Sequence, residues 1–418
     1  MFENIMERQI EHDVILINRM NEQTCILNGS GMKIWHMLKK FGSFSRLQQT
    51  TAIPEYMKDD YEQFVSGLKG FIDGNSSKVG PSLHQYFLKK DVPLAVGLEI
   101  GLSCQLNCRH CYNPEPRSKE RLSTDDVKKV SEDMKRMGTP FVIVTGGEPL
   151  AHPEFNKICE ILAANGFAYK IFTNGYGMTK EIAKRLKELN CFLVAFTLFG
   201  ADDKTHEYIT RTKDSFKRIC NAIRFVKDSE INVAVTFFLM KHNFKIREKM
   251  RRFAEEELGV VPSFTFSVTP KESGSLAPVS LRIRQKQLET FITENGIEES
   301  LSEDCGRSDS PLCTAGRTIA AINTKGEVLP CLSLPIPAGN IHNESFSDIW
   351  RKSTVFQSFK RRKIEELKEC VNCKMKDICL RCYTGAMLEG GDLLGRAPHS
   401  CEVTSILYKK NKKGGVDK

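Results

Sequence analysis

Residues 95–275 alternate between two patterns of hydrophobic and polar positions. Short apolar runs, which predict strands, are separated by longer stretches whose apolar residues recur at helical spacing. Six strand–helix units in series predict a parallel sheet with right-handed crossovers. Since a closed TIM barrel has eight such units, we expect an α/β fold built on a partial (β/α)6 TIM-like barrel over residues 95–300. The expected strands are Val96–Ser103, Phe141–Gly146, Ala168–Gly175, Phe192–Gly200, Ile231–Leu239 and Ser263–Val268.

Residues 1–75 follow a different order, with strands first and helices afterwards. Two strand-like runs joined by a polar turn predict a hairpin, and two helical stretches follow with a shorter helix expected between them. This order predicts a winged helix-turn-helix-like domain. We assign residues 76–94 to a linker, because the run Gly74–Ser82 is rich in Gly and Ser. The runs are Val14–Asn18 and Thr24–Asn28 for the strands, and Gly31–Phe41 and Tyr61–Ile72 for the helices.

Length, composition and charge narrow the class of protein. A chain of 418 residues suggests two or three domains, and its 40% hydrophobic content excludes a wholly disordered chain. The formal net charge is +9, and five lysines lie within residues 409–418, which we expect to form a basic disordered tail. The longest apolar stretch is about half a membrane span, and the charged start lacks the apolar core of a signal peptide. We therefore expect a cytoplasmic protein without a membrane partner.

The cysteines are unevenly placed. Of the 15 cysteines, eight lie between Cys305 and Cys401 and three lie between Cys104 and Cys111. A large cytosolic chain does not need disulfide bonds, and clustered thiols in a reducing compartment indicate metal ligands. The remaining four fall in strand or helix patterns and are expected to be buried, inert thiols. These are Cys25, Cys159, Cys191 and Cys220.

The first cysteine group follows the first predicted strand of the barrel. Its spacing is Cys104-x3-Cys108-x2-Cys111. Three thiolates on one loop can bind three irons of a [4Fe–4S] cluster and leave the fourth iron open for an exchangeable ligand. The alternative is a zinc site with His110 nearby.

With this group the chain resembles the radical S-adenosylmethionine (SAM) enzymes. Their CxxxCxΦC signature has an aromatic residue before the last cysteine, where this chain has His110. Further family motifs follow at the ends of the second, third and fourth strands, where barrel enzymes hold their active sites. The resemblance implies reductive cleavage of SAM to a 5′-deoxyadenosyl radical, which abstracts a hydrogen atom from the substrate. It also implies cofactor-binding roles for Gly146, Gly147, Glu148, Thr173, Asn174, Thr197 and Arg211.

The second cysteine group resembles a SPASM domain, which we place at residues 301–408. It begins with the pattern C-x12-G-x4-C and continues with two CxxC pairs and a last cysteine. The family more often has three residues, and not two, between the cysteines of the second pair. The resemblance implies two fully ligated [4Fe–4S] clusters, and so three clusters per chain with the first group. Spacing alone fits a zinc ribbon equally well. The implied ligands are Cys305, Cys313, Cys331 and Cys382 for one cluster, and Cys370, Cys373, Cys379 and Cys401 for the other.

The amino-terminal unit resembles the RiPP recognition element of peptide maturases, which adds a leader peptide as a strand beside its hairpin. A helix-turn-helix could instead bind DNA. However, the expected recognition helix, Tyr61–Ile72, contains one lysine and no arginine, which is too little positive charge for phosphate contacts. We therefore expect no nucleic-acid partner.

Together the three resemblances imply a radical peptide maturase that modifies a ribosomally made precursor. They also imply an external electron donor such as flavodoxin or ferredoxin. Thioether formation, as in sactipeptide synthases, is the leading expectation, followed by carbon–carbon cross-linking and other peptide oxidations. Formylglycine formation by sulfatase maturation is less favoured, because the aspartate that usually follows the SPASM cysteine is replaced by Leu332. No general base stands out. A zinc-stabilised nucleic-acid-binding protein is the alternative from another class.

Overall fold

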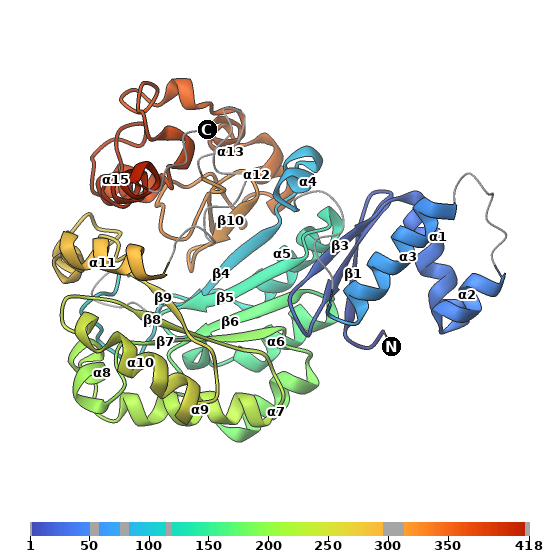
Figure 1. Cartoon of the computed structure of the whole chain (residues 1–418), viewed down its shortest axis with the longest axis horizontal. Helices are drawn as coiled ribbons and strands as arrows, with labels where there is room; N and C mark the ends of the chain where they lie inside the picture. Colours follow the sequence, from blue (N-terminus) through green and yellow to red (C-terminus); the bar gives the residue numbers. More distant parts are fainter. Residues whose placement is uncertain (1, 51–57, 76–82, 114–118, 296–312, 414–418) are drawn as a thin grey trace.

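The computed structural model describes residues 2–50, 58–75, 83–113, 119–295 and 313–413 (Figure 1). Its centre is one sheet of nine strands in the order β12-β11-β10-β4-β5-β6-β7-β8-β9. The strands from β4 to β9 pair in parallel, which confirms the predicted partial barrel. These strands are β4 (Ala95–Gly101), β5 (Phe141–Gly146), β6 (Ala168–Thr173), β7 (Leu193–Leu198), β8 (Val233–Phe238) and β9 (Ser263–Thr265).

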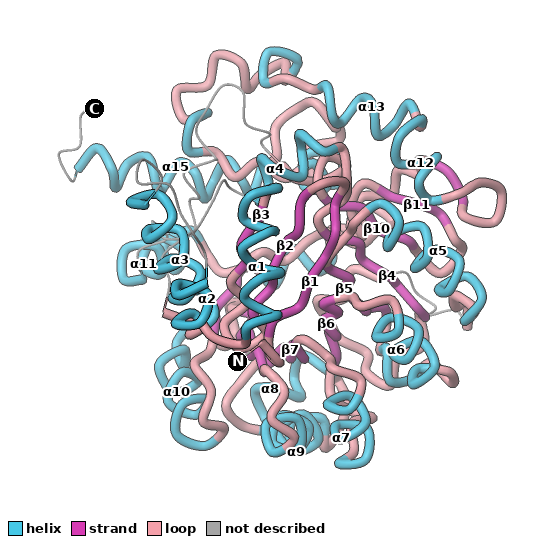
Figure 2. Tube along the Cα trace, turned by 90° about the vertical axis from the view of Figure 1, so that its right-hand side faces the viewer, coloured by secondary structure: helices cyan, strands magenta, loops and turns pink. Residues whose placement is uncertain are grey.

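The connecting helices lie on the outside of this curved sheet (Figure 2). The first of them begins at Ser123 with a capping box, in which Ser123 and Asp126 each satisfy the other's backbone N–H. The apolar faces of these helices pack on the strands in one continuous core. The helices are α5 (Thr124–Met137), α6 (Phe155–Ala164), α7 (Lys180–Glu188), α8 (Asp203–Thr210), α9 (Ser215–Asp228) and α10 (Arg247–Arg252), and α11 (Gln285–Asn295) follows β9.

The cysteine-rich C-terminal region extends the same sheet. Strand β10 (Ile319–Ile322) pairs in parallel with β4, and two antiparallel strands follow it. These strands were not predicted from the sequence, because they are only two to four residues long and β10, to which the other two are joined, pairs with a strand more than 200 residues away. The remaining elements are β11 (Glu327–Leu329), β12 (Gly339–Asn340), α12 (Phe346–Lys352), α13 (Thr354–Arg361), α14 (Tyr383–Leu388) and α15 (Pro398–Lys413).

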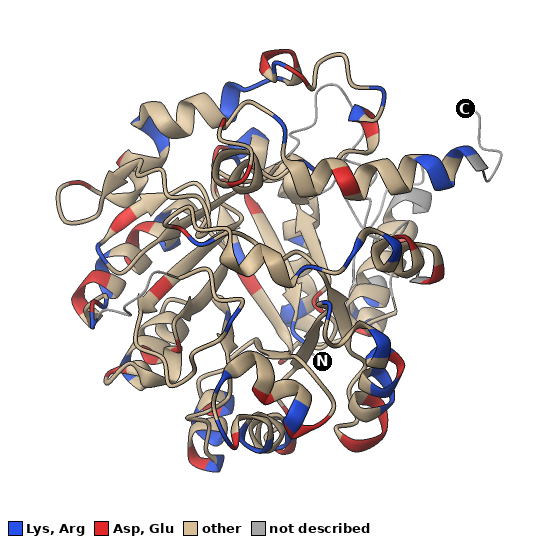
Figure 3. Cartoon of the chain, turned by 90° about the vertical axis from the view of Figure 1, so that its left-hand side faces the viewer, with Lys and Arg blue, Asp and Glu red and all other residues tan. Residues whose placement is uncertain are grey.

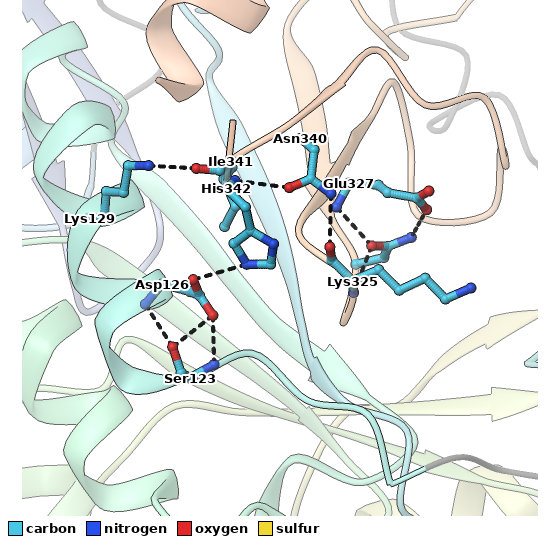
Figure 4. A network of polar contacts seen from close by, with 9 residues as sticks. Ser123, Asp126, Lys129, Lys325, Glu327, Asn340, Ile341 and His342 are labelled. Carbon is cyan, nitrogen blue, oxygen red and sulfur yellow. Dashed lines mark hydrogen bonds and ion pairs between the residues drawn. The ribbon is translucent and has the colours of Figure 1, made fainter. Parts of the chain in front are cut away.

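Polar contacts join this region to the barrel. His342 Nε2 lies 3.1 Å from Asp126 Oδ1, and Lys129 Nζ donates to the Ile341 carbonyl at 2.6 Å (Figure 4). On the other side, Arg282 forms a two-pronged ion pair with Glu389, with N–O distances of 2.9 and 2.8 Å. The side chains of Arg282 and Glu389 are each at most 13% exposed. The ion pair therefore joins the barrel and the C-terminal region at a place largely shielded from water.

The amino-terminal unit has a three-stranded antiparallel sheet in the order β1-β2-β3, followed by three helices. The first strand was not predicted from the sequence, because its alternating buried positions lie in a charged segment. Side chains of β2 are buried on both faces. Val14 and Leu16 face the three helices, whereas Ile15 and Ile17 join the core of the barrel. The elements are β1 (Ile5–Ile10), β2 (Asp13–Asn18), β3 (Thr24–Leu27), α1 (Gly29–Phe41), α2 (Phe44–Thr50) and α3 (Lys58–Ile72).

This unit packs against the amino-terminal ends of the barrel strands (Figure 1). Arg8 donates to the carbonyl of Gly166, just before β6, at 2.7 Å, and its guanidinium lies 4.6 Å from the ring centre of Phe167. Ile10 packs against Gly138, where a Cβ atom would lie 2.6 Å from the isoleucine Cγ1. The unit therefore lies at the opposite end of the barrel from the loops that follow the strands.

Two expected segments differ from the structure. The proposed linker 76–94 contains a helix, α4 (Leu83–Lys90), in which Tyr86 and Phe87 are buried and the Tyr86 hydroxyl donates to Asp13 at 2.7 Å. The proposed disordered tail is helical up to Lys413, because α15 continues beyond the residues that pack on the core. Residues 76–82 and 414–418 lie outside the described residues. No helix in the described part of the chain has the length and hydrophobicity needed to cross a bilayer.

Candidate functional site

The loop after β4 carries the first cysteine group at the carboxyl ends of the strands. Two backbone hydrogen bonds fasten it to the end of α8, from Asn107 N to the Thr210 carbonyl at 3.1 Å and from Arg109 N to the Ile209 carbonyl at 2.9 Å. All three thiols of this group are partly exposed and line a cavity of about 630 Å³. The structure therefore brings the three predicted ligands to one side of one cavity. They are Cys104, Cys108 and Cys111.

The two glycines after β5 allow this loop to lie against the strand end. A Cβ atom on Gly146 would lie 2.2 Å from the Gly101 carbonyl oxygen, and one on Gly147 would lie 2.3 Å from the Leu102 carbonyl oxygen. Gly146 also has φ of +147°, which side-chain-bearing residues rarely adopt. Because no side chain lies between the two segments, Gly147 N can donate a hydrogen bond to the Gly101 carbonyl at 2.8 Å. The close approach that requires glycine is thus between two backbone segments, and both glycines also line the cavity.

Glu148 lies behind the cavity wall and is only 1% exposed. Its carboxylate accepts hydrogen bonds from Thr173 Oγ1 at 2.5 Å, Asn174 N at 2.7 Å and Leu150 N at 3.0 Å. Burial raises the pKa of Glu148 to about 7, and the hydrogen bonds from Thr173, Asn174 and Leu150 act against that shift. The carboxylate therefore organises the turn after β6.

That turn reaches the cysteine loop. Asn174 Nδ2 donates to Cys104 Sγ at 3.3 Å, and Gly175 N donates to Thr173 Oγ1 at 3.0 Å. Thr173, Asn174 and Thr197 all line the cavity. Arg211 does not line it, since it ends α8 with φ of 53° and its side chain is exposed. It follows Thr210, which binds the cysteine loop, and therefore lies beside the site but outside its wall.

Two histidines and two phenylalanines form the wall near the last two cysteines of the loop. His110 lies 4.6 Å from Phe199 and 5.5 Å from Phe238, measured between ring centres. His206 is 1% exposed, and its Nδ1 accepts a hydrogen bond from Phe199 N at 3.3 Å. Burial, with a smaller contribution from His110, lowers the pKa of His206 to about 3. His206 and Phe199 were not predicted from the sequence, where they resemble ordinary core residues.

A buried carboxylate near this site was also missed. Glu99 is 5% exposed, and burial, followed by the charge of Glu272, raises its pKa to about 7. The same two carboxylates act on Tyr112, whose hydroxyl pKa is raised first by burial. The signal in the sequence was a single glutamate within the otherwise apolar strand VGLEIG.

The wall of the cavity is uncharged. No Asp, Glu, Lys or Arg occurs among the described residues that line it. Figure 3 shows Lys, Arg, Asp and Glu mainly on the outer helices and loops. A charged group that enters this cavity must therefore be neutralised by hydrogen bonds, by the backbone or by a bound group.

The second cysteine group is divided between two places. Burial raises the pKa of Cys313 to about 11, and Cys382 and Cys331 are close enough to add to that shift. Cys331 also lines the large cavity, next to Leu332 and Ser333. Cys305 lies outside the described residues.

The other four thiols line one small hollow at the start of α15. None of them is fully buried, which fits a group bound near the surface. Within the described residues, no three His, Cys, Asp or Glu side chains converge on a point that could hold one metal ion. The thiols of a four-iron cluster bind different irons, so they need not converge in that way. The four thiols are Cys370, Cys373, Cys379 and Cys401.

The four cysteines expected to be inert are all buried. Burial raises the pKa of Cys25, Cys191 and Cys220 to about 12 in each case, and that of Cys159 is raised as well. None of them lines either cavity, so the structure gives them no part in the site.

Comparisons with known proteins agree with this geometry. Residues 98–255 match the radical SAM superfamily, and residues 313–374 match the SPASM iron–sulfur cluster-binding domain. An AdoMet-dependent heme synthase of Methanosarcina barkeri is 27% identical over 77% of this chain and 99% of its own. The mycofactocin maturase MftC of Mycobacterium tuberculosis is 25% identical over 76% of this chain and 86% of its own.

The crystal structure of SuiB from Streptococcus suis bound to its precursor peptide SuiA superposes with a TM-score of 0.65. It covers 96% of this chain and 98% of its own at 16% identity, a likeness that shows the fold.

Proposed function

We propose that this chain, which carries a radical SAM domain and a SPASM iron–sulfur domain, modifies a ribosomally made precursor peptide in the cytoplasm. The two domains bind [4Fe–4S] clusters and SAM, and the reduced cluster supplies the electron that cleaves SAM to a 5′-deoxyadenosyl radical. The observation that carries the proposal is a loop of three thiols in the wall of an uncharged cavity, which Cys331 of the C-terminal domain also lines.

In this proposal the loop thiols Cys104, Cys108 and Cys111 hold the cluster that binds SAM. The Asn174 amide, 3.3 Å from Cys104 Sγ, stabilises negative charge on that sulfur. From behind the cavity wall, Glu148 accepts a hydrogen bond from the backbone N–H of Asn174 and so fixes the position of that residue. Gly146, Gly147, Thr173 and Thr197 supply backbone and hydroxyl groups around the same cavity.

The C-terminal thiols hold two further clusters. The small hollow at α15 receives one of them, with Cys370, Cys373, Cys379 and Cys401 as ligands. Cys313, Cys331 and Cys382, together with Cys305, serve the other. Cys331 lines the large cavity, so a cluster held by these thiols would be ligated at the cavity wall, where it would supply an electron acceptor. An external donor such as flavodoxin or ferredoxin reduces the enzyme.

The amino-terminal unit binds the leader of the precursor at the open edge of β3. Asn18 N donates to the Gln23 carbonyl at 2.9 Å, so hydrogen-bonded pairs alternate from there along β2 and β3. By this alternation the backbone groups of Thr24 and Ile26 point away from β2. No strand pairs with that edge among the described residues, so an extended peptide can add to it.

Three kinds of peptide modification are candidates for the reaction. Thioether formation leads, carbon–carbon cross-linking comes second, and formylglycine formation is opposed by Leu332 in the cavity wall after Cys331. A heme-type substrate is the alternative suggested by the M. barkeri relative. Co-expression with a candidate precursor distinguishes a peptide from such a substrate.

The test is modification of a candidate precursor encoded by a small open reading frame beside this gene. Co-expression with the enzyme should lower the mass of the peptide by the mass of two hydrogen atoms for each link. Cys104→Ala should abolish the change. A peptide of unchanged mass, with SAM cleavage intact and every neighbouring frame tested, would exclude the proposal.

Leader binding needs a point variant, because removing residues 1–75 would expose Ile15 and Ile17 of the barrel core. Ile26→Pro removes one N–H from the open edge and leaves the pairing with β2 in place. Ile26→Val, which keeps that N–H, is the matched control. We expect Ile26→Pro alone to weaken binding of the precursor while SAM cleavage without peptide is unchanged. Equal binding by both variants would exclude the edge as the leader site.

A further inference from the structure

The cavity continues from the cysteine loop into the interior of the sheet. Five of its lining residues are small and belong to strands β4, β7 and β10. In closed TIM barrels this interior is filled by Val, Ile and Leu side chains. Small side chains at these positions leave the interior open, so the cavity extends below the level of the cysteines. The five residues are Ala95, Gly97, Ala195, Ala320 and Ala321.

Larger apolar side chains surround this lower part of the cavity. Ile143 of β5 pairs with Gly97 in the sheet, and Ile319 pairs with Ala95. Phe172 of β6 also lines the cavity and is 45% exposed, an unusual exposure for a phenylalanine inside a sheet. Its ring therefore presents apolar surface that a bound group could cover.

Leu332 closes the lower part from the side of the C-terminal domain. Its Cδ1 lies 2.9 Å from the position that a Cβ atom on Gly97 would occupy. The leucine is partly exposed and lines the cavity directly after Cys331. Ala195, three strands away along the sheet from Gly97, forms part of the wall on β7. These two side chains therefore limit the room inside the sheet.

We propose that the lower part of the cavity is a pocket for one apolar side chain of the precursor peptide, with Leu332 and Ala195 setting its size. This inference rests on the proposed function and specifies its substrate. A charged side chain in the pocket would lose its hydration without finding a charged partner, because the described lining residues contain none. An apolar side chain instead gains contact with the ring of Phe172.

The experiment measures the affinity of small probes for the reconstituted holoenzyme with SAM by equilibrium dialysis. N-acetyl-leucine amide, N-acetyl-asparagine amide and N-acetyl-aspartate amide have side chains of similar shape and differ in polarity and charge. We expect the leucine probe to bind at least about tenfold more tightly than the asparagine probe, from burial of its side chain. The aspartate probe should bind more weakly still.

Variants of the wall test the place of binding. Leu332→Ala should raise the affinity for N-acetyl-phenylalanine amide relative to the leucine probe by about fourfold for each carbon of room gained. Ala195→Val should lower the same ratio, and it provides a second test if Leu332→Ala does not fold. Leu276→Ala is the control, since Leu276 is 50% exposed and lies outside the cavity.

Two results would overturn the proposal. One is binding of the aspartate probe that equals or exceeds that of the leucine probe, or no binding of any probe. The other is a ratio of phenylalanine to leucine affinity that neither wall variant changes. In these cases co-expression with a precursor can still produce the modified peptide, so failure of the pocket is distinguishable from failure of the proposed function.

Discussion

Gly147→Ala tests whether the contact between two backbone segments positions the cysteine loop. The new Cβ atom would lie 2.3 Å from the Leu102 carbonyl oxygen and 2.7 Å from that of Ser103. Since Cβ atoms do not approach other atoms within 3.0 Å, the loop must move by at least 0.7 Å. Gly147 has no left-handed φ, so the substitution adds bulk without backbone strain.

The movement has an energetic and a catalytic consequence. It stretches the hydrogen bonds from Gly147 N to Gly101 and from Glu148 N to Ser103, which together contribute about 2 kcal/mol. A displacement approaching 1 Å at the reacting group lowers a rate by about a hundredfold. We therefore expect SAM cleavage to fall by about that factor, or the loop cluster to be lost.

The assay counts iron per chain after anaerobic reconstitution and measures the rate of SAM cleavage. The variant should keep the iron of the C-terminal domain, because its thiols lie outside the contact. Gly29→Ala is the control, since a Cβ atom there meets no atom within 4 Å and the residue has no positive φ. Full iron content together with unchanged cleavage in Gly147→Ala would refute the reasoning.

Three further predictions concern the clusters, the pH dependence and the contact between domains. Cys104→Ala should reduce iron from about twelve to about eight per chain and abolish SAM cleavage, measured by iron analysis and chromatography. The folded-state pKa of His206, about 3, lies below its usual value, so His206 contributes stability above pH 6.5 that is lost as the pH falls towards 3. Between pH 7 and pH 5 the wild type should lose about 2 kcal/mol of unfolding free energy that His206→Asn keeps, measured by denaturant titration. Glu389→Ala should lower the unfolding free energy by about 3 kcal/mol, because it leaves Arg282 buried and unpaired.

Each of these predictions has an outcome that contradicts it. Cleavage of SAM by Cys104→Ala would place the reactive cluster elsewhere. Parallel pH profiles for wild type and His206→Asn would show that His206 is not held neutral by burial. If Arg282→Met combined with Glu389→Leu is as unstable as Glu389→Ala, the loss does not come from the unpaired arginine.

The strands of the barrel could be predicted from the sequence because each is a local apolar run followed by a helical period. The spacing of Cys104, Cys108 and Cys111 also specified their chemistry, since three thiols on one loop stay close in any fold. The resemblance to radical SAM and SPASM proteins, confirmed by the family matches, rested on the same local motifs.

Other features depended on contacts between distant residues. Strand β10 pairs with β4 across more than 200 residues, and this pairing brings Cys331 and Leu332 into the cavity. Neither the length of β10 nor its composition indicated a partner. Glu148 was predicted at the site, but only the packing of the strand ends placed its carboxylate behind the wall. Arg211 was predicted there as well, and the end of α8 directs it outside.

The sequence by itself determined the order of the elements and the chemistry of the cysteines, because both depend on residues within a few positions of one another. The tertiary structure decided where the amino-terminal unit packs, which thiols share a cavity and how much room the interior leaves. Those properties depend on the sum of many side-chain volumes and on pairing between distant strands. A glycine at position 97 indicates only flexibility in the sequence, whereas in the folded chain it makes room for Leu332.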